Sequence, residues 1–305
     1  MFSFREKKKT WHSWYKATAA EMDKIITFLS PIEHSCISIT SRLMEGSSLN
    51  ANLLKQQEVY LEKKGREIVS LLMISNDSII APVFTSGSSA LVPDELLKQS
   101  PLIKKKYLTF MGLKDDVKRL ELSFKNRSKL SVDYFQLTAE SAGIPGRVKK
   151  YLDHKNNAVS RSLLISRAEL SDLDRLMPLR SAYEIEEVLL NKTHFSEPAC
   201  RNRFKKTINK KSVFFAVLDN KPIATCCINS EGLGWYQIGG VYTIPEYRSR
   251  GISAKLMAEL SQAAGTFQKN LTLFVKKNNL PALKLYSNCG FAMTEEFRIT
   301  YAERI

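Results

Sequence analysis

The sequence predicts an α/β protein built from two similar units, and three observations support this fold class. Segments with helical and strand periodicity alternate along the 305 residues, and the series helix, strands, helix, strands occurs twice. Each half has a hairpin in which an isoleucine precedes a hydroxyl by two residues, Ile68 and Ser70 in one and Ile223 and Thr225 in the other. With 44% hydrophobic and 25% charged residues, the chain can form packed cores. We interpret the repeat as an internal duplication, with two unrelated hairpins of similar turn chemistry as the alternative.

The first half is expected to begin with a helix and to continue with strands. Thr18 and Glu21 form a capping box at the start of an amphipathic helix, and Pro31 ends it. The segment 138–157 combines small residues, a proline and a basic tract, which is typical of a domain boundary. The expected domains are therefore 1–140 and 161–305, joined by a linker at 141–160. Turn residues and apolar alternation in this half predict strands at 36–40, 59–62, 68–74, 78–84, 106–111 and 134–137 and a helix at 114–124.

The second half is expected to repeat this order of elements. Cys226 and Cys227 are adjacent in one of its strands, so their side chains should point to opposite faces of a sheet. The expected helices are 171–181, 197–210, 251–267 and 279–288, and the expected strands are 162–166, 213–218, 222–229, 235–243, 271–275 and 291–301.

Composition excludes several classes of protein. The net charge of +15 does not identify a partner by itself. Because the chain has no zinc finger, RNA-recognition motif or basic repeat with interleaved aromatics, we interpret the charge as a solvated surface that also attracts a polyanionic small molecule, rather than as a nucleic-acid interface. Its five cysteines are scattered and its four histidines lack helical ligand spacing, so neither a disulfide framework nor a metal site is expected. No apolar run reaches the roughly 20 residues of a membrane span. These features predict a cytoplasmic protein without a membrane partner.

The segment 235–257 has the pattern of an anion-binding turn. A strand ends near Thr243, a short loop contains Gly251, and an amphipathic helix follows. The start of a helix presents free N–H groups and the positive end of the helix dipole, which together attract phosphate. Small residues at 251 and 253 allow an anion to approach the backbone, and Arg248 and Arg250 add positive charge.

A second motif follows at 273–291. A buried strand leads into a helix that Gly290 is expected to end as its C-cap. Asn279 and Tyr286 are seven residues apart, which is two helical turns, so both should project from the same side.

Together, the two motifs resemble those of the GCN5-related N-acetyltransferase (GNAT) superfamily, in element order over the whole second half. The loop Arg248-Ser-Arg-Gly-Ile-Ser253 departs from the family pattern only by Ser253, where glycine or alanine is usual, and the motif from Asn279 to Phe291 is complete. The resemblance implies two tandem GNAT-like domains, each a mixed, mostly antiparallel twisted sheet flanked by helices. The first is expected to be degenerate, because it lacks the arginine–glycine loop; an unrelated α/β cap is the alternative.

The resemblance also implies an N-acetyltransferase that moves an acetyl group from acetyl-CoA to an amine of a small molecule or peptide. Tyr286 is expected to act as general acid on the thioester sulfur, and the strand that carries residues 241–243 to splay from its neighbour. The residues expected to bind the cofactor are Val241, Tyr242, Thr243, Arg248, Ser249, Arg250, Gly251, Ile252, Ser253, Ala254 and Asn279.

The base that removes the amine proton stays open at this stage. Some family members have a glutamate on the strand before Asn279, but Phe274 occupies that position here. Glu246, Gln237 and Tyr236 are substitutes by location alone, and the acceptor pocket is expected around 184–196. A non-catalytic acyl-CoA sensor is the alternative function, and a nucleic-acid-associated protein is a further rival. The acceptor and the oligomeric state do not follow from the sequence.

Overall fold

The computed structural model describes residues 12–45, 48–49, 57–89, 91–125, 127–154, 163–190, 192–210 and 212–304, which form two compact units. The first unit consists of Met1–Tyr134 and Glu296–Ile305, and the second of Phe135–Glu295. The expected domains at 1–140 and 161–305 differ from these units in two places: the second unit already begins at Phe135 and includes the expected linker, and the last strand of the chain returns to the first unit.

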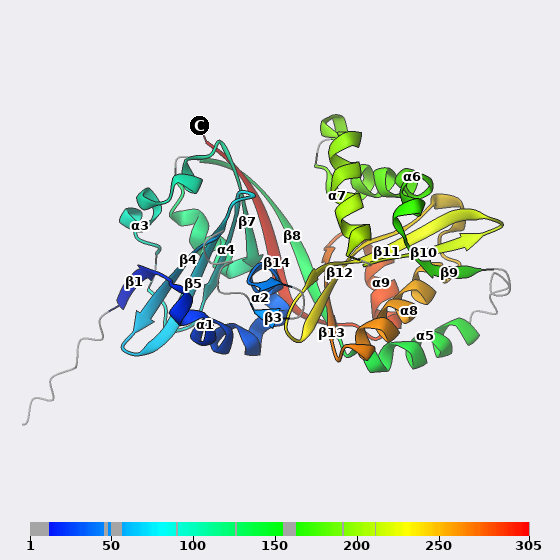
Figure 1. Cartoon of the computed structure of the whole chain (residues 1–305), viewed down its shortest axis with the longest axis horizontal. Helices are drawn as coiled ribbons and strands as arrows, with labels where there is room; N and C mark the ends of the chain where they lie inside the picture. Colours follow the sequence, from blue (N-terminus) through cyan, green and yellow to red (C-terminus); the bar gives the residue numbers. More distant parts are fainter. Residues whose placement is uncertain are drawn as a thin grey trace, which may run out of the picture. The chain divides into compact units, whose positions relative to one another are not determined.

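In the first unit, helices cover both faces of a sheet (Figure 1). Leu71 and Met73 pack against α1 (Met22–Leu29) and α2 (Glu33–Thr40), whereas Leu72 and Ile74 pack against α3 (Asp94–Gln99) and α4 (Lys114–Leu122). This alternation is the period of two expected of a strand buried on both faces. The sheet order is β1 (His12–Lys16), β4 (Gln57–Lys64), β5 (Glu67–Ser75), β6 (Ile79–Phe84), β7 (Tyr107–Leu113) and β14 (Ala292–Arg304), antiparallel except for the parallel pair β6–β7. A separate ladder joins β2 (Met44–Glu45) to β3 (Ser48–Leu49).

The strand expected at 36–40 is wrong, since these residues belong to α2. The isoleucines and the threonine of this segment are β-branched, which favours a strand locally. Ser35 to Thr40 are all buried, so the helix has no polar face from which its period could be recognised. Tertiary burial outweighs the local preference here.

The second unit has the same layers around its own sheet, with α6 (Leu173–Tyr183) and α7 (Glu197–Asn209) on one face and α5 (Ile144–Asp153), α8 (Ile252–Thr266) and α9 (Leu280–Cys289) on the other (Figure 1). Cys226 lies in the core against α8, and Cys227 in the core against α6, which confirms that they point to opposite faces. All five cysteines are buried free thiols. The sheet order is β13 (Asn270–Lys276), β12 (Trp235–Thr243), β11 (Lys221–Glu231), β10 (Val213–Leu218) and β9 (Leu164–Arg167), and only β12–β13 is parallel.

The expected linker carries secondary structure in its described part. Residues 141–153 form η5 (Ser141–Gly143) and α5, and Ile144 and Val148 of α5 are buried in the core of the second unit. Residues 155–160 of the expected linker lie outside the described residues. Among the described residues, no helix is both long and apolar enough to span a bilayer.

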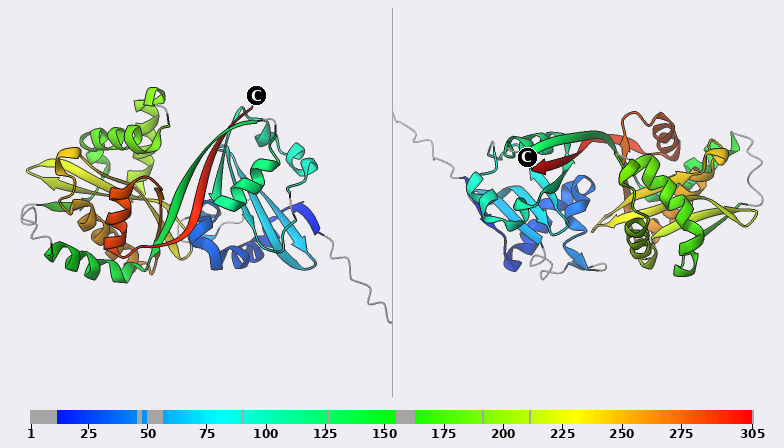
Figure 2. Two further views of the ribbon diagram at one scale, coloured as in Figure 1. Left: turned by 180° about the vertical axis from the view of Figure 1, so that it is seen from behind. Right: turned by 90° about the horizontal axis from the view of Figure 1, so that it is seen from above.

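The order of elements within the two units confirms the repeat expected from the sequence. A strand, two helices, three antiparallel strands, a helix, a parallel strand, a helix and a long strand occur in each half. The two long strands are shared between the units: β8 (Arg127–Ala139) starts in the first unit and ends in the second, and β14 does the reverse (Figure 2). In the second unit, Gln136 of β8 donates a hydrogen bond to Thr272 Oγ1 on β13 at 3.3 Å. In the first, β14 pairs with β7 from Phe297–Leu113 to Glu303–Tyr107.

Candidate functional site

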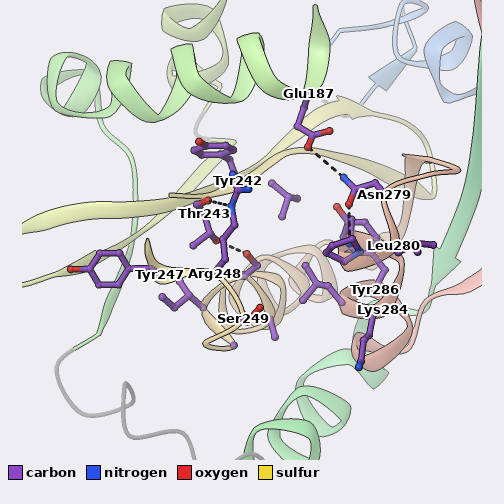
Figure 3. Close-up of a pocket in the computed structure, with 18 of the residues that line it drawn as sticks. Glu187, Tyr242, Thr243, Tyr247, Arg248, Ser249, Asn279, Leu280, Lys284 and Tyr286 are labelled. Carbon is purple, nitrogen blue, oxygen red and sulfur yellow. Dashed lines mark hydrogen bonds between the residues drawn. The ribbon is translucent and has the colours of Figure 1, made fainter. Parts of the chain in front are cut away.

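A cavity of about 880 Å³ lies in the second unit, where β12 and β13 end and α8 and α9 begin (Figure 3). Every residue expected from the sequence to bind the cofactor lines it, except Arg250, which packs its guanidinium over the Tyr247 ring at 5.0 Å. Tyr286 also lines the cavity. The tertiary structure thus brings together residues from two motifs, 235–257 and 273–291, that are separated by fifteen residues in the sequence.

The cavity opens because the two parallel strands part. The paired residues of β12 and β13 run from Trp235–Asn270 to Ile238–Leu273, although both strands continue beyond them. A bulge in β12 follows at once: Gly240 has φ +59, and a Cβ there would lie 2.7 Å from Cys227 Sγ. The bulge therefore requires glycine, and it turns the end of β12 away from β13.

Beyond the bulge, alternate amides of β12 point toward the cavity. Ile244 donates its N–H to Ile223 O on the side of β11, at 3.0 Å. Because successive N–H groups of a strand point to opposite sides, Val241 and Thr243 direct theirs away from β11. This edge of β12 has the form of a strand that can accept an extended partner.

The turn before α8 enters the helix at a glycine. Gly251 is the N-cap residue with φ +77, and the first intrahelical bond runs from Lys255 N–H to Gly251 O at 3.1 Å. The amides of the first turn therefore precede the helical ladder, and this turn contains no acidic residue. Ser253 has its hydroxyl 2.7 Å from the hydroxyl of Thr243, which ties the turn to the end of β12.

Arg248 is fastened to the protein by three groups. Its Nε donates to Thr243 O at 2.9 Å and its Nη2 to Glu186 Oε2 at 2.8 Å, and its guanidinium lies 5.4 Å from the centre of the Tyr242 ring. The hydrogen bond to Glu186 is the main reason that the pKa of Arg248 is raised. In this arrangement, the arginine holds the loop against β12.

On the opposite side of the cavity, Asn279 begins α9 (Figure 3). Its Oδ1 accepts from Ala282 N–H at 3.1 Å, as an N-cap side chain does, and its Nδ2 donates to Glu187 Oε1 at 3.4 Å. Both polar atoms of this side chain thus have protein partners.

Tyr286 is 7% exposed and stands edge-on to Phe291, with ring centroids 5.8 Å apart. Burial is the main cause that raises the pKa of its phenol well above the usual range. The phenol therefore keeps its proton across the physiological pH range and can act there as a hydrogen-bond donor.

The cavity also contains residues to which the sequence assigned no role, notably Glu186, Glu187, Lys276, Lys284 and Tyr151. The two glutamates fall in the segment expected to form the acceptor pocket, and a run of acidic residues in a strongly basic chain is a signal that could have singled them out. Tyr151 comes from α5, inside the expected linker, where no sequence signal pointed to it.

Comparison with known protein families decides the identity of this unit. The sequence model of the acetyltransferase (GNAT) family matches residues 179–291. These residues form a GNAT domain. The match runs from the end of α6 to the end of α9 and includes both motifs that line the cavity.

Solved structures extend the likeness in fold over the whole chain. A tandem GNAT protein from the clavulanic acid biosynthesis pathway is 11% identical and has a TM-score of 0.55, with 97% of this chain and 99% of that chain covered. A GCN5-related N-acetyltransferase from Sphaerobacter thermophilus is 12% identical, with a TM-score of 0.53 and coverage of 96% and 95%. A Drosophila protein is 13% identical, with a TM-score of 0.61 and coverage of 94% and 97%. No curated protein sequence matches the chain. The GNAT fold is therefore present twice in tandem.

In the first unit, the end of β6 and the start of α3 correspond to the end of β12 and the start of α8, and their contacts differ. The Asp116 carboxylate accepts the N–H of Phe84, the last residue of β6, at 3.2 Å. A Cβ on Gly112 would lie 3.3 Å from Pro82 O, so β6 and β7 stay close where β12 and β13 part. The helix that corresponds to α8 is α3, and acidic residues occupy its first turn. In the described residues of the first unit, the amide at the end of β6 therefore has a carboxylate partner, and the first turn of α3 is acidic where that of α8 is not.

Proposed function

We propose that the GNAT domain is an acetyl-CoA-dependent N-acetyltransferase whose acceptor is an amine of a small molecule or peptide. The observation that carries the proposal is that a free strand edge, an anion-binding turn and a buried phenol all face one cavity. Acetyl-CoA is an extended molecule with a diphosphate at one part and a thioester at its end, and this cavity offers a complementary group for each.

Two segments of the chain would bind different parts of acetyl-CoA. The edge of β12 at Val241 and Thr243 would hold the pantetheine arm by main-chain hydrogen bonds, with Thr243 O already used by Arg248. The first turn of α8, from Gly251 to Ala254, would hold the diphosphate through its amides and the helix dipole. When bound, acetyl-CoA supplies the acyl thioester that the amine attacks.

Tyr286 would donate a proton to the sulfur as the thiolate leaves. A positioned general acid contributes roughly 10² to 10⁴ in rate. The Val241 amide is the expected donor to the carbonyl oxygen, on which negative charge develops during attack. Both groups are fixed by secondary structure, α9 and β12 respectively, so they need little reorganisation.

The test measures acetyl-CoA affinity and thiol release with a panel of primary amines. Tyr286→Phe should bind acetyl-CoA normally and lose roughly 10² to 10⁴ of kcat. Normal turnover in this variant would refute the acid role, and acetyl-CoA binding by wild type without turnover on any amine would favour a sensor.

Gly251→Glu tests the anion-binding turn, with Gly251→Ala as the matched control. Both variants place a Cβ at a positive φ, but only the first adds a negative charge. Two like charges about 7 Å apart near a protein surface repel by about 2 kcal/mol, so Gly251→Glu should weaken acetyl-CoA about 30-fold beyond Gly251→Ala. Equal affinities of the two variants would place the diphosphate elsewhere.

A further inference from the structure

The end of α6 opens into a wider turn that brings two carboxylates to the cavity. This turn, η8 (Glu184–Val188), closes with a hydrogen bond from Leu189 N–H to Glu184 O at 2.9 Å, which spans five residues. Such π-type turns insert one residue into a helix and are frequent at functional sites. Both Glu186 and Glu187 line the cavity as a result.

The two carboxylates have different partners. Glu186 forms an ion pair with Arg248 at 2.8 Å and so belongs to the group that fastens the anion-binding turn. Glu187 has longer contacts: Oε1 lies 3.4 Å from Asn279 Nδ2, and Oε2 lies 3.9 Å from Lys276 Nζ. Its side chain is 30% exposed and lies at the edge of the cavity, above Asn279 in the view of Figure 3.

Glu187 and Tyr286 can contact the same ligand. Both residues line the cavity, Glu187 from η8 and Tyr286 from α9. A ligand that fills the cavity would meet the carboxylate of Glu187 and the hydroxyl donor of Tyr286.

The other candidates for a base do not reach the cavity. Phe274 lies on β13 before Asn279, and its side chain has no acid–base function. Glu246 is exposed on η10 (Pro245–Tyr247), and Tyr236 is buried with its hydroxyl 3.4 Å from Glu231 Oε1. Neither these two nor Gln237 lines the cavity, and among the described residues that do, the carboxylates are Glu186 and Glu187.

We propose that Glu187 binds the protonated amine of the acceptor and removes the proton that blocks its attack. The proposal rests on the proposed acetyltransferase function and names the class of acceptor, an amine that is cationic at neutral pH. The ammonium transfers one proton to the Glu187 carboxylate, and the nitrogen lone pair then forms the C–N bond to the acyl carbon. As the C–S bond breaks, the thiolate takes a proton from Tyr286. The second proton of the nitrogen restores the phenol, and Glu187 releases its proton to water.

The experiment compares wild type with Glu187→Gln, Glu187→Asp and the control Glu246→Gln. Acetyl-CoA affinity is measured first, by calorimetry, and should be unchanged in all variants. With a strongly basic primary amine at pH 7, kcat/KM should fall roughly 10² to 10³ in Glu187→Gln, recover in part in Glu187→Asp, and stay at the wild-type value in Glu246→Gln. The Glu187→Gln variant can use only amine that is already deprotonated in solution. Its kcat/KM should therefore rise about tenfold per pH unit until the pH reaches the amine pKa.

A second acceptor separates a chemical role from a structural one. A weakly basic aromatic amine is neutral at pH 7 and gives Glu187 neither a positive charge to bind nor a proton that must leave before attack. Glu187→Gln should therefore lose less than about tenfold with this acceptor. Equal losses with both amines, or wild-type activity of Glu187→Gln on the basic amine, would overturn the role of Glu187 and leave the acetyltransferase proposal intact. Failure of wild type to bind acetyl-CoA, or to acetylate any amine, would overturn both.

Discussion

The shared strand β14 leads to a sharp prediction about stability. Phe297 is in the C-terminal part of this strand, opposite Leu113 of β7, and is 1% exposed in the first unit. Truncation of a fully buried phenylalanine costs about 3 to 5 kcal/mol, from lost burial and from the cavity that remains. Phe297→Ala should therefore remove a large part of the 5 to 15 kcal/mol that is typical of a domain.

The same strand offers a matched control. Met293 lies at the start of β14, in the second unit, and is 64% exposed. Met293→Ala should change stability by less than about 0.5 kcal/mol, because an exposed side chain loses little burial.

Hydrogen exchange followed by mass spectrometry locates the effect. In Phe297→Ala, amides of β4 to β7 should lose protection by about 100-fold or more, which corresponds to about 3 kcal/mol, and amides of β10 to β13 should change far less. A variant that loses protection mainly between 213 and 276 would refute the assignment of the last strand to the first unit. So would a variant that is as stable as wild type.

Three further predictions follow from the polar contacts of the first unit. Because the Asp116 carboxylate occupies the Phe84 amide, calorimetry should find one acetyl-CoA per chain, and two would contradict this inference. Burial raises the pKa of Asp116 to about 6, whereas the unfolded chain ionises this group near pH 4, so stability is lost as the pH rises from about 4 to 6. Asp116→Asn should therefore raise the free energy of unfolding at pH 7 by roughly 1 to 3 kcal/mol and by much less at pH 4, as measured with urea. Hydrogen bonding from Arg298 lowers the pKa of Asp133 to about 2, so the stabilisation of the fold by this ion pair is present above about pH 4 and lost as the pH falls toward 2. Asp133→Asn should lower the free energy of unfolding by at most about 1 kcal/mol at pH 7, because the pair is partly exposed. An equal loss at pH 2 would contradict the ion pair.

Much of the fold could be predicted because local patterns agreed with the final structure. The capping box at Thr18, the hairpin about Gly65 and the helix that Gly290 ends are specified by residues close in sequence. The segment 36–40 failed for the opposite reason, since its helix is buried and its residues favour a strand. Local preference is a weak guide wherever every side chain is buried.

Part of the candidate site could be predicted from the sequence, and part could not. The places of Gly251 and Asn279 at the starts of α8 and α9 could be predicted because a turn with positive φ and a helix cap need particular residue types. Glu187 could not be assigned a role, because its position over the cavity depends on the π-type turn and on the packing of α6 against the sheet. The segment was expected to be near the acceptor, but the residue was not identified.

The sequence by itself determined the repeated α/β order, the glycine turn before α8 and the helix that carries Tyr286, because each depends on contacts between residues close in sequence. The tertiary structure alone decided that β14 completes the first unit, that the Asp116 carboxylate accepts the N–H at the end of β6, and that Glu187 and Tyr286 line the same cavity. These features depend on contacts between residues far apart in the chain, and long-range pairing is set by the total burial of apolar surface and the satisfaction of polar groups, which no local pattern encodes.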